Sequence, residues 1–236
     1  DVGITDDDLA AIARTTRYVA REPSPELGDL CEHTAIGVWH GLRACLEIAG
    51  LKRARVAIQG VGGVGMLLAQ LLHREGMELV VADVNTARAA QAGRELGAQV
   101  VAPEEILTTP CDVLAPCALG GVITAQNAAS IRARIVCGSA NNILASPEAG
   151  DTLAARGILY APDYLVNAGG LIRGAEYYLL GRPDSHPSLE RIYERMLRVA
   201  RLSRERGIST SRIADELAQA RLKRPKMFQE LTWRAR

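Results

Sequence analysis

The sequence is poor in aromatic residues and lysine, and it has no long apolar run. Aromatic side chains make up 4% of its 236 residues, and only Lys52, Lys223 and Lys226 accompany 25 arginines. Few aromatics among many small and aliphatic residues are typical of a helix-rich α/β protein rather than a β-sandwich. No apolar run approaches the roughly 20 residues that span a bilayer, and no signal-peptide pattern is present. We therefore expect no membrane segment and no membrane partner.

The net charge and the cysteines indicate which further ligands and which cellular setting to expect. A net charge of +1, from 28 basic and 27 acidic residues, gives no electrostatic reason to expect nucleic acid. The five cysteines are odd in number, and neither they nor the four scattered histidines have metal-ligand spacing. We expect no metal site, and a reduced, cytoplasmic setting.

The stretch from Arg55 to Asp83 combines a β-prone run, a glycine-rich turn, an apolar helix pattern, a second strand and an acid. Gly60, Gly62 and Gly65 form G-x-G-x-x-G. One glycine makes the tight turn, one lets backbone approach a pyrophosphate, and one allows helix and strand to pack closely. The helix start would direct its unpaired N–H groups at that pyrophosphate. About 20 residues on, Asp83 is placed to accept hydrogen bonds from the adenosine ribose hydroxyls and to repel a 2′-phosphate. The pattern predicts NAD binding in preference to NADP.

Strand and helix patterns alternate as far as residue 161. This alternation predicts an α/β fold of the Rossmann type, with a doubly wound, mostly parallel sheet, flanking helices and a helical C-terminal segment. The loops after residues 59, 83, 115 and 138 should then share one crevice at the carboxyl ends of the strands. For the glycine motif, a plain strand-to-helix turn or a Rossmann-like domain for another adenosine ligand is the alternative to dinucleotide binding. Outside the alternating part, longer helices are expected at 6–20, 33–48, 188–206 and from 209 or 211 to about 222. Within it, short helices are expected from 103 and at 125–131.

Seven motifs follow one another along the chain: Asp1 to Gly3, Thr34 to Val38, Gly60 to Gly65, Asp83 to Asn85, Cys111 to Ala118, Gly138 to Asn142 and Ala161 to Gly170. In residue type and order they resemble the amino-acid dehydrogenases that act on glutamate, leucine, phenylalanine and valine, with the leucine and phenylalanine branch most similar. The resemblance covers nearly the whole chain to about residue 220.

The resemblance implies NAD-dependent oxidative deamination of an L-amino acid to its 2-oxo acid and ammonia, and the reverse reaction. Such enzymes have a substrate domain and a cofactor domain, with catalysis in the cleft between them, and we expect a homo-oligomer when the enzyme is complete. By this similarity, residues 1–33 would be the end of the substrate domain with its connecting helix or loop. Residues 34–222 would be the NAD-binding domain with C-terminal helices, and 223–236 a tail.

The resemblance also implies site residues. Asp1 matches the family's catalytic acid, and Asn167 matches an amide that binds substrate nitrogen or cofactor. An exposed terminal residue and a structural turn amide are the alternatives for these two. Helix capping would explain Thr34, and packing would explain Cys117, without any cofactor contact. The implied cofactor-binding residues are Thr34, Gly60, Gly62, Gly63, Val64, Gly65, Asp83, Val84, Cys117, Ala118, Ala140, Asn141 and Asn167.

The sequence departs from the family in its lysines. The family performs its proton chemistry with lysines upstream of the Asp-Val-Gly motif, and no lysine here falls at a matching position. Arginine cannot replace a lysine that must release a proton. Because the sequence also begins without methionine, we expect a piece of a longer dehydrogenase whose N-terminal substrate domain is supplied in cis. One half of a split enzyme completed in trans, and a catalytically silent NAD-binding module, remain alternatives.

Two positions bear on the substrate. Leu171 and Gly174 correspond to residues that line the side-chain pocket in the leucine branch, where small branched side chains stand. Glycine removes one wall of that pocket. We expect a preference for large apolar or aromatic L-amino acids over valine.

Overall fold

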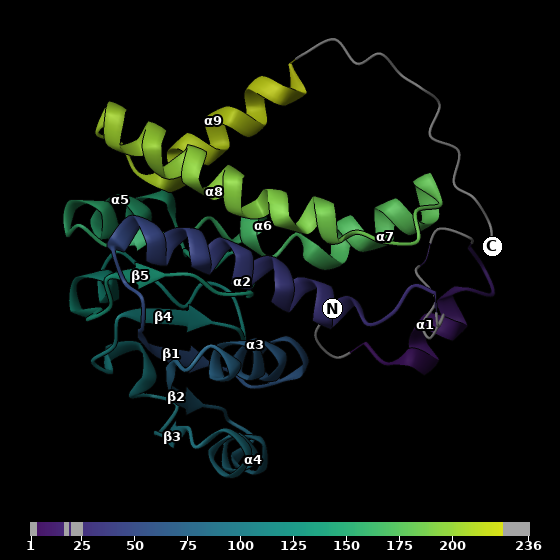
Figure 1. Ribbon diagram of the computed structural model, residues 1–236, viewed down its shortest axis with the longest axis horizontal. Coiled ribbons are helices and arrows are strands. Elements are labelled where there is room, and N and C mark those ends of the chain that lie inside the picture. Colours follow the sequence, from purple (N-terminus) through teal and green to yellow (C-terminus); the bar gives the residue numbers. More distant parts are fainter. Residues whose placement is uncertain (1–3, 17–18, 20–25, 224–236) are drawn as a thin grey trace.

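The computed structural model describes residues 4–16, 19 and 26–223. This part of the chain forms a six-stranded parallel sheet flanked by helices, which confirms the α/β prediction (Figure 1). The strands are β1 (Arg55–Gln59), β2 (Glu78–Ala82), β3 (Gln99–Val100), β4 (Val113–Pro116), β5 (Ile135–Val136) and β6 (Leu159–Tyr160).

The sheet is doubly wound. Its strands lie in the order β3-β2-β1-β4-β5-β6, and every neighbouring pair is parallel. Val56 of β1 is in register with Leu79 on one side and Val113 on the other. The chain therefore winds outward from β1 in one direction and returns to its other side at β4. The carboxyl ends of β1 and β4 border the topological switch point.

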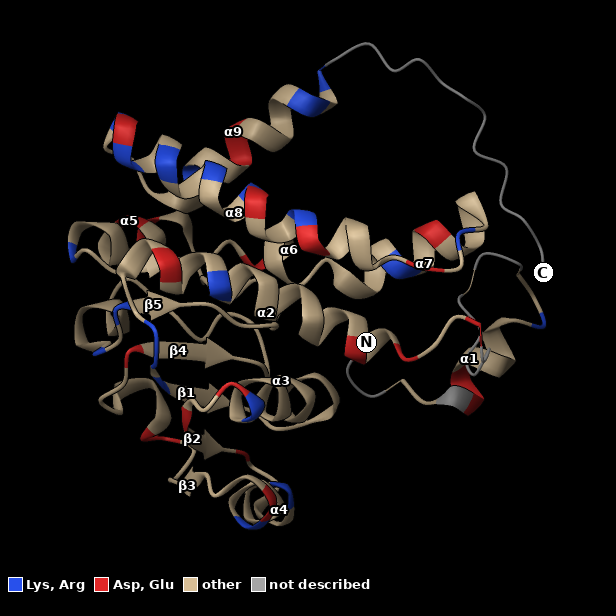
Figure 2. Cartoon of the chain, in the orientation of Figure 1, with Lys and Arg blue, Asp and Glu red and all other residues tan. Residues whose placement is uncertain are grey.

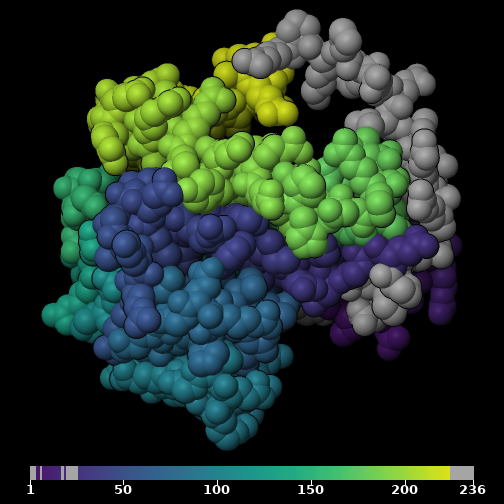
Figure 3. Space-filling view, in the orientation of Figure 1, coloured from purple at the N-terminus to yellow at the C-terminus, as the bar shows by residue number. Residues whose placement is uncertain are grey.

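Helices cover both sides of the sheet. The α-helices are α1 (Asp6–Ile12), α2 (Leu30–Ala49), α3 (Gly63–Arg74), α4 (Thr86–Leu96), α5 (Pro147–Ala155), α6 (Asp163–Val166), α7 (Gly169–Leu180), α8 (His186–Arg206) and α9 (Thr210–Leu222), and the 3-10 helices are η1 (Ile106–Thr108) and η2 (Asn127–Ser130). α2 lies between the sheet and the layer made by α7 and α8 (Figures 1 and 3). Within the described residues, no helix is long and apolar enough to cross a membrane.

Alternate residues of β1, β2, β4, β5 and β6 face two separate cores. Val56 and Ile58 of β1 pack in the core that includes residues of α2, α3 and α8. Ala57, between them, packs in the second core with residues of η1, η2 and α5. Strands covered on both faces read as continuous apolar runs, which is why β1, β2 and β4 were visible in the sequence. Both acidic and basic residues lie along α8, and the basic ones are more numerous (Figure 2).

The structure corrects several predicted helix ends. α1 ends at Ile12, and the predicted end at about Ala20 lies outside the described residues. α2 begins at Leu30 rather than His33, because the Asp29 carboxylate accepts the Cys31 N–H at 2.7 Å and caps the helix. The predicted boundary between residues 33 and 34 therefore falls inside α2.

Two short predicted helices are 3-10 turns instead. η1 begins at Ile106, after the predicted proline start, and η2 replaces the α-helix expected at 125–131. In η2, the Asn127 side chain accepts the Thr124 N–H at 2.8 Å and donates to the Val122 carbonyl at 2.8 Å. Such local side-chain bonds close a turn at the expense of a longer helix.

Candidate functional site

The carboxyl ends of the central strands bring several predicted loops to one edge of the sheet. The glycine-rich turn follows β1, and Asp83 follows β2. Cys117 and Ala118 follow β4. Because all these strands are parallel and adjacent in the sheet, their ends meet at the same edge.

Two glycines of the turn are required by the fold itself. Gly60 has φ of +89°, and a methyl group placed there would lie 2.8 Å from the Cβ of Ala118. A methyl group at Gly65 would lie 2.0 Å from the carbonyl oxygen of Gly60. These glycines therefore make the tight turn and let α3 pack directly on it, the two structural roles expected from the motif.

Gly62 has a different environment. Its φ of −73° suits any residue, and the nearest atom to an added methyl group is the Arg88 Nη1 atom at 3.7 Å. Packing among the described residues therefore does not explain a glycine here. Gly62 is also the N-cap of α3, the helix that begins with Gly63 and Val64. No side-chain cap bonds the backbone N–H groups at this helix start. An anion could approach this backbone closely, and a side chain at residue 62 would block it.

Asp83 is fixed beside this turn. One carboxylate oxygen accepts the Val61 N–H at 2.9 Å, and the other accepts the Asn85 N–H at 2.8 Å. Each oxygen retains a further lone-pair direction, so the carboxylate can hold the turn and still accept hydrogen bonds from a ligand. Val84, the next residue, is 88% exposed and presents an apolar side chain beside it.

The residues after β4 pack against the turn. The Cys117 N–H donates to the Gln59 carbonyl at 2.7 Å, which extends the pairing of β4 with β1. Desolvation raises the pKa of the Cys117 thiol, so the sulfur is protonated near neutral pH and is a poor nucleophile. Ala118 lies against Gly60. Both residues thus border the predicted cofactor site, and packing accounts for the cysteine.

A second group of predicted residues meets at the end of β5. The Asn167 Nδ2 atom donates to Asn141 Oδ1 at 2.8 Å and to the Ser139 carbonyl at 3.2 Å. Ala140 is buried, and its N–H donates to the Pro116 carbonyl at 3.0 Å. This last bond joins the Asn141 loop to the end of β4, so the two amides lie on the same edge of the sheet as the glycine turn.

Asp163 anchors the loop that carries this amide pair. Its carboxylate accepts the Asn142 N–H, and it accepts the Tyr160 hydroxyl at 2.9 Å. Asn142 has φ of +53°, a conformation that this anchor helps to hold. Burial raises the pKa of Tyr160, so its hydroxyl remains a donor to Asp163. These contacts make Asp163 a structural residue of the loop.

Comparison with known proteins fits this arrangement. A family model for glutamate/leucine/phenylalanine/valine dehydrogenase matches residues 81–176. Leucine dehydrogenase from Geobacillus stearothermophilus is 40% identical over 230 residues, which cover 94% of this chain and 62% of that protein. The chain is homologous to these amino-acid dehydrogenases.

Solved structures of dehydrogenases share the fold. L-tryptophan dehydrogenase from Nostoc punctiforme matches with a TM-score of 0.79 and 35% identity, covering 94% of this chain and 66% of that one. Hetero-hexameric glutamate dehydrogenase from Thermus thermophilus matches with a TM-score of 0.70 and 25% identity, covering 96% and 64%. The chain thus spans slightly less than two thirds of the length of these dehydrogenases.

Thr34 lies at a different place in its helix from the one predicted. Thr34 lies in the second turn of α2 rather than at its start. Its hydroxyl donates to the Leu30 carbonyl at 2.9 Å and accepts the Gly170 N–H at 3.2 Å. The side chain therefore ties α2 to the start of α7, and its cofactor contact stays a prediction.

The first turns of α7 present the two residues predicted to line a substrate pocket. Leu171 is 77% exposed. A methyl group at Gly174 would meet no atom of the described residues within 4 Å. Residues three apart share one side of a helix, so both lie on an open face of α7.

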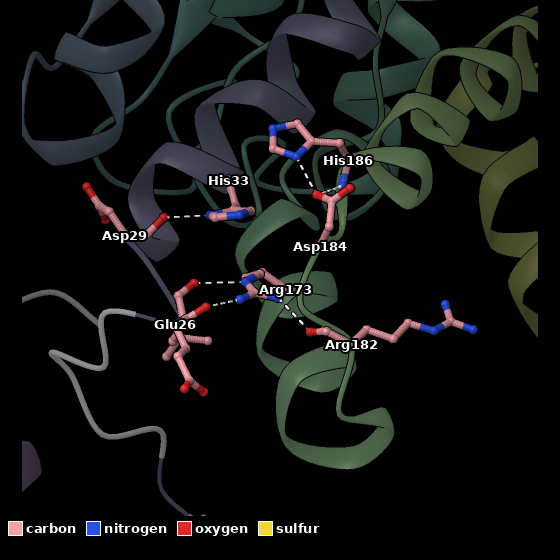
Figure 4. Close-up of polar contacts among 8 residues, drawn as sticks. Glu26, Asp29, His33, Arg173, Arg182, Asp184 and His186 are labelled. Atoms are coloured by element: carbon pink, nitrogen blue, oxygen red, sulfur yellow. Dashed lines mark hydrogen bonds and ion pairs between the residues drawn. The ribbon is translucent and has the colours of Figure 1, made fainter.

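Arg173, between those two positions, was not predicted from the sequence. Its side chain is 2% exposed and donates to the Leu27 carbonyl at 2.8 Å, to the Glu26 carbonyl and to the Arg182 carbonyl at 3.0 Å (Figure 4). The guanidinium thus joins α7 to the segment that precedes α2. A buried arginine among backbone carbonyls leaves no periodic signal in a sequence.

The remaining predicted residues lie elsewhere. Asp1 and Lys226 lie outside the described residues. Lys52 lies between α2 and β1, at the amino end of that strand, and Lys223 follows α9. Among the described residues, no cluster of histidine, cysteine, aspartate or glutamate has the arrangement of a metal site.

Proposed function

We propose that this chain is the NAD-binding part of an L-amino-acid dehydrogenase, with residues 34–222 as the cofactor domain. One observation carries this proposal. Gly60 and Gly65 are required by packing, whereas a methyl group at Gly62, at the uncapped start of α3, would meet Arg88 only at an ordinary contact distance. A glycine that the fold does not need, at the centre of this motif, is explained by a pyrophosphate that approaches the backbone there.

The surrounding residues fit the rest of the dinucleotide. Asp83 is oriented by Val61 and Asn85 and has lone pairs left for the ribose hydroxyls, which favours NAD over NADP. Cys117, Ala118, Ala140 and Asn141 would line the path toward the nicotinamide. The chemistry that NAD supplies when bound is acceptance of a hydride from the substrate Cα.

In this reaction the chain's own residues would bind and orient the substrate and the cofactor. Amides such as Asn141 and Asn167 donate and accept hydrogen bonds but do not move protons at neutral pH. Proton transfer needs a carboxylate or an amine, for which we propose Asp1 together with lysines on a further segment supplied in cis or in trans. The isolated chain would then bind NAD without turnover, and the complete enzyme, as an oligomer, would deaminate an amino acid to a 2-oxo acid and ammonia.

The substrate would be an apolar, preferably large, L-amino acid. Leu171 and Gly174 lie on the open face of α7, close in sequence to Asn167. The missing side chain at residue 174 leaves room where the leucine branch of the family has a branched residue. L-tryptophan dehydrogenase is among the relatives that share this fold, which supports a roomy pocket.

Calorimetric titration of the chain with NAD tests the proposal, using Gly62→Ala and Gly65→Ala as a matched pair. We expect micromolar to millimolar binding by the unmodified chain. Gly62→Ala should stay folded, with only the small loss of stability that alanine causes at an N-cap. It should lose at least about 10-fold in NAD affinity, because a methyl group fits the fold but blocks the pyrophosphate. Gly65→Ala should instead unfold at lower temperature, because its methyl group would collide with the Gly60 carbonyl.

Two outcomes would contradict the cofactor site. Unchanged NAD affinity in a folded Gly62→Ala variant would mean that no ligand approaches this backbone. Absence of NAD binding by the unmodified chain would remove the chain's role as an independent cofactor domain. Activity assays after mixing with a lysine-bearing substrate domain then separate a catalytic subunit from a silent NAD-binding module.

A further inference from the structure

The guanidinium of Arg88 lies beside the open glycine of the turn. Arg88 is the third residue of α4, and its Nη1 atom is the nearest atom to a methyl group placed on Gly62, at 3.7 Å. The residue is exposed, and within the described part of the chain its guanidinium makes no hydrogen bond or ion pair. A cation without a partner therefore stands at the edge of the proposed dinucleotide site.

Helix stability does not explain an arginine at this position. The first turn of a helix carries partial positive charge, which favours acids and disfavours cations. The first turn of α4 contains no acid, and Asn85 already caps the Ala87 and Arg88 N–H groups. Arg94, in the last turn of the same helix, has the favourable placement for a cation. Arg88 is thus a residue whose charge suits an anion from outside the chain.

Asp83 and Arg88 lie beside neighbouring residues of the glycine turn. The Asp83 carboxylate contacts the Val61 N–H, and the Arg88 guanidinium lies beside Gly62. In dinucleotide-binding folds an acid at this strand end takes the ribose 2′-hydroxyl, and a nearby arginine accommodates a 2′-phosphate. This site holds both groups at once.

We propose that Arg88 receives the 2′-phosphate of NADP, so that the site binds NADP as well as NAD and Arg88 sets the ratio of the two affinities. This inference rests on the proposed cofactor site. Asp83 still favours NAD, because a carboxylate accepts hydroxyl hydrogens and repels a phosphate. The guanidinium offsets that repulsion with paired N–H donors, which match the oxygens of a phosphate. The preference for NAD is therefore moderate.

Calorimetric titration with NAD and with NADP tests the assignment on three proteins: the unmodified chain, Arg88→Ala and Arg94→Ala. The last is a matched control, because it removes an arginine from the same helix away from the turn. We expect Arg88→Ala to weaken NADP binding by roughly 10- to 100-fold, the usual effect of losing a hydrogen bond to a charged group. NAD affinity should fall much less, because NAD lacks the 2′-phosphate, and Arg94→Ala should change neither affinity.

Added salt provides a second readout. Because Arg88 is exposed, raising the salt concentration should weaken NADP binding more than NAD binding in the unmodified chain. Arg88→Ala should abolish that difference. Thermal unfolding of the variant should match the unmodified chain, since no contact within the fold is removed.

Each other result has a definite meaning. Equal weakening of NAD and NADP in Arg88→Ala would overturn the proposal, because the guanidinium would then contact a part that both dinucleotides share. NAD binding without measurable NADP binding by the unmodified chain would overturn it as well, and would leave the proposed NAD site intact. Failure of the unmodified chain to bind either dinucleotide would overturn both the proposed function and this inference.

Discussion

The carboxylate of Asp83 accepts the backbone N–H of Val61 at 2.9 Å. This bond links the end of β2 to the turn after β1, so the acid expected to recognise a ribose also holds the glycine turn in place. Its second oxygen accepts the Asn85 N–H at 2.8 Å. One side chain therefore connects the position of the turn, the start of α4 and the proposed recognition of adenosine.

We predict that Asp83→Asn lowers both the stability of the fold and the affinity for NAD. Asparagine retains one acceptor oxygen and replaces the other with a donor, so one of the two backbone N–H groups loses its partner. The free energy of unfolding should fall by about 1 to 3 kcal/mol, measured by urea denaturation alongside NAD titration. An unchanged unfolding free energy would mean that these bonds do not stabilise the turn.

We predict that Arg173→Met loosens the segment before α2. The substitution keeps an apolar stem but removes donors to the Glu26, Leu27 and Arg182 carbonyls. Unpaired buried acceptors should lower the free energy of unfolding by about 2 to 4 kcal/mol. Limited proteolysis should also show faster cleavage near residues 26–29. Arg201→Met, at an exposed position on α8, is the control and should change neither quantity.

We predict that Cys31 is the first cysteine to be alkylated and that NAD slows its reaction. Its Sγ atom would lie 3.3 Å from a methyl group at Gly63, beside the proposed pyrophosphate position. Cys45 and Cys137 are fully buried. Burial raises the pKa of Cys111 to about 11, which leaves about one thiolate in a thousand at pH 8.

Peptide mass spectrometry after timed alkylation at pH 8 measures this order. Because a raised pKa keeps Cys111 protonated until the pH approaches that value, its labelling rate should keep rising up to about pH 11. Earlier labelling of Cys111 than of Cys31, or no protection of Cys31 by NAD, would contradict the prediction.

We predict that Gly174→Val shifts substrate preference toward smaller amino acids. Valine fits the open face of α7, since no atom in the described part of the chain lies within 4 Å of an added methyl group. The added branches should narrow the proposed pocket and reduce kcat/KM for phenylalanine and tryptophan relative to valine by about 10- to 200-fold. The measurement requires an active enzyme that contains this chain. A parent enzyme that already prefers valine would contradict the roomy pocket.

The positions of the central strands and the glycine turn were predictable because they follow local rules. Apolar runs bounded by turn residues identified β1, β2 and β4, and the spacing of Gly60, Gly62, Gly65 and Asp83 identified the motif. Helix starts were less predictable where two capping patterns compete. Asp29 and Thr34 both suit a helix start, and only the packing of α2 against α7 shows that Asp29 is the cap and Thr34 a contact.

The sequence by itself determined which loops lie at the carboxyl edge of the sheet, because residue periodicity and turn chemistry act between near neighbours in the chain. Only the tertiary structure decided what those residues face. It distinguished the open Gly62 from the packed Gly60 and Gly65, placed Arg88 beside the turn, and buried Arg173 among carbonyls of a distant segment. Such pairings depend on how elements pack in space, and no pattern along the chain encodes them directly.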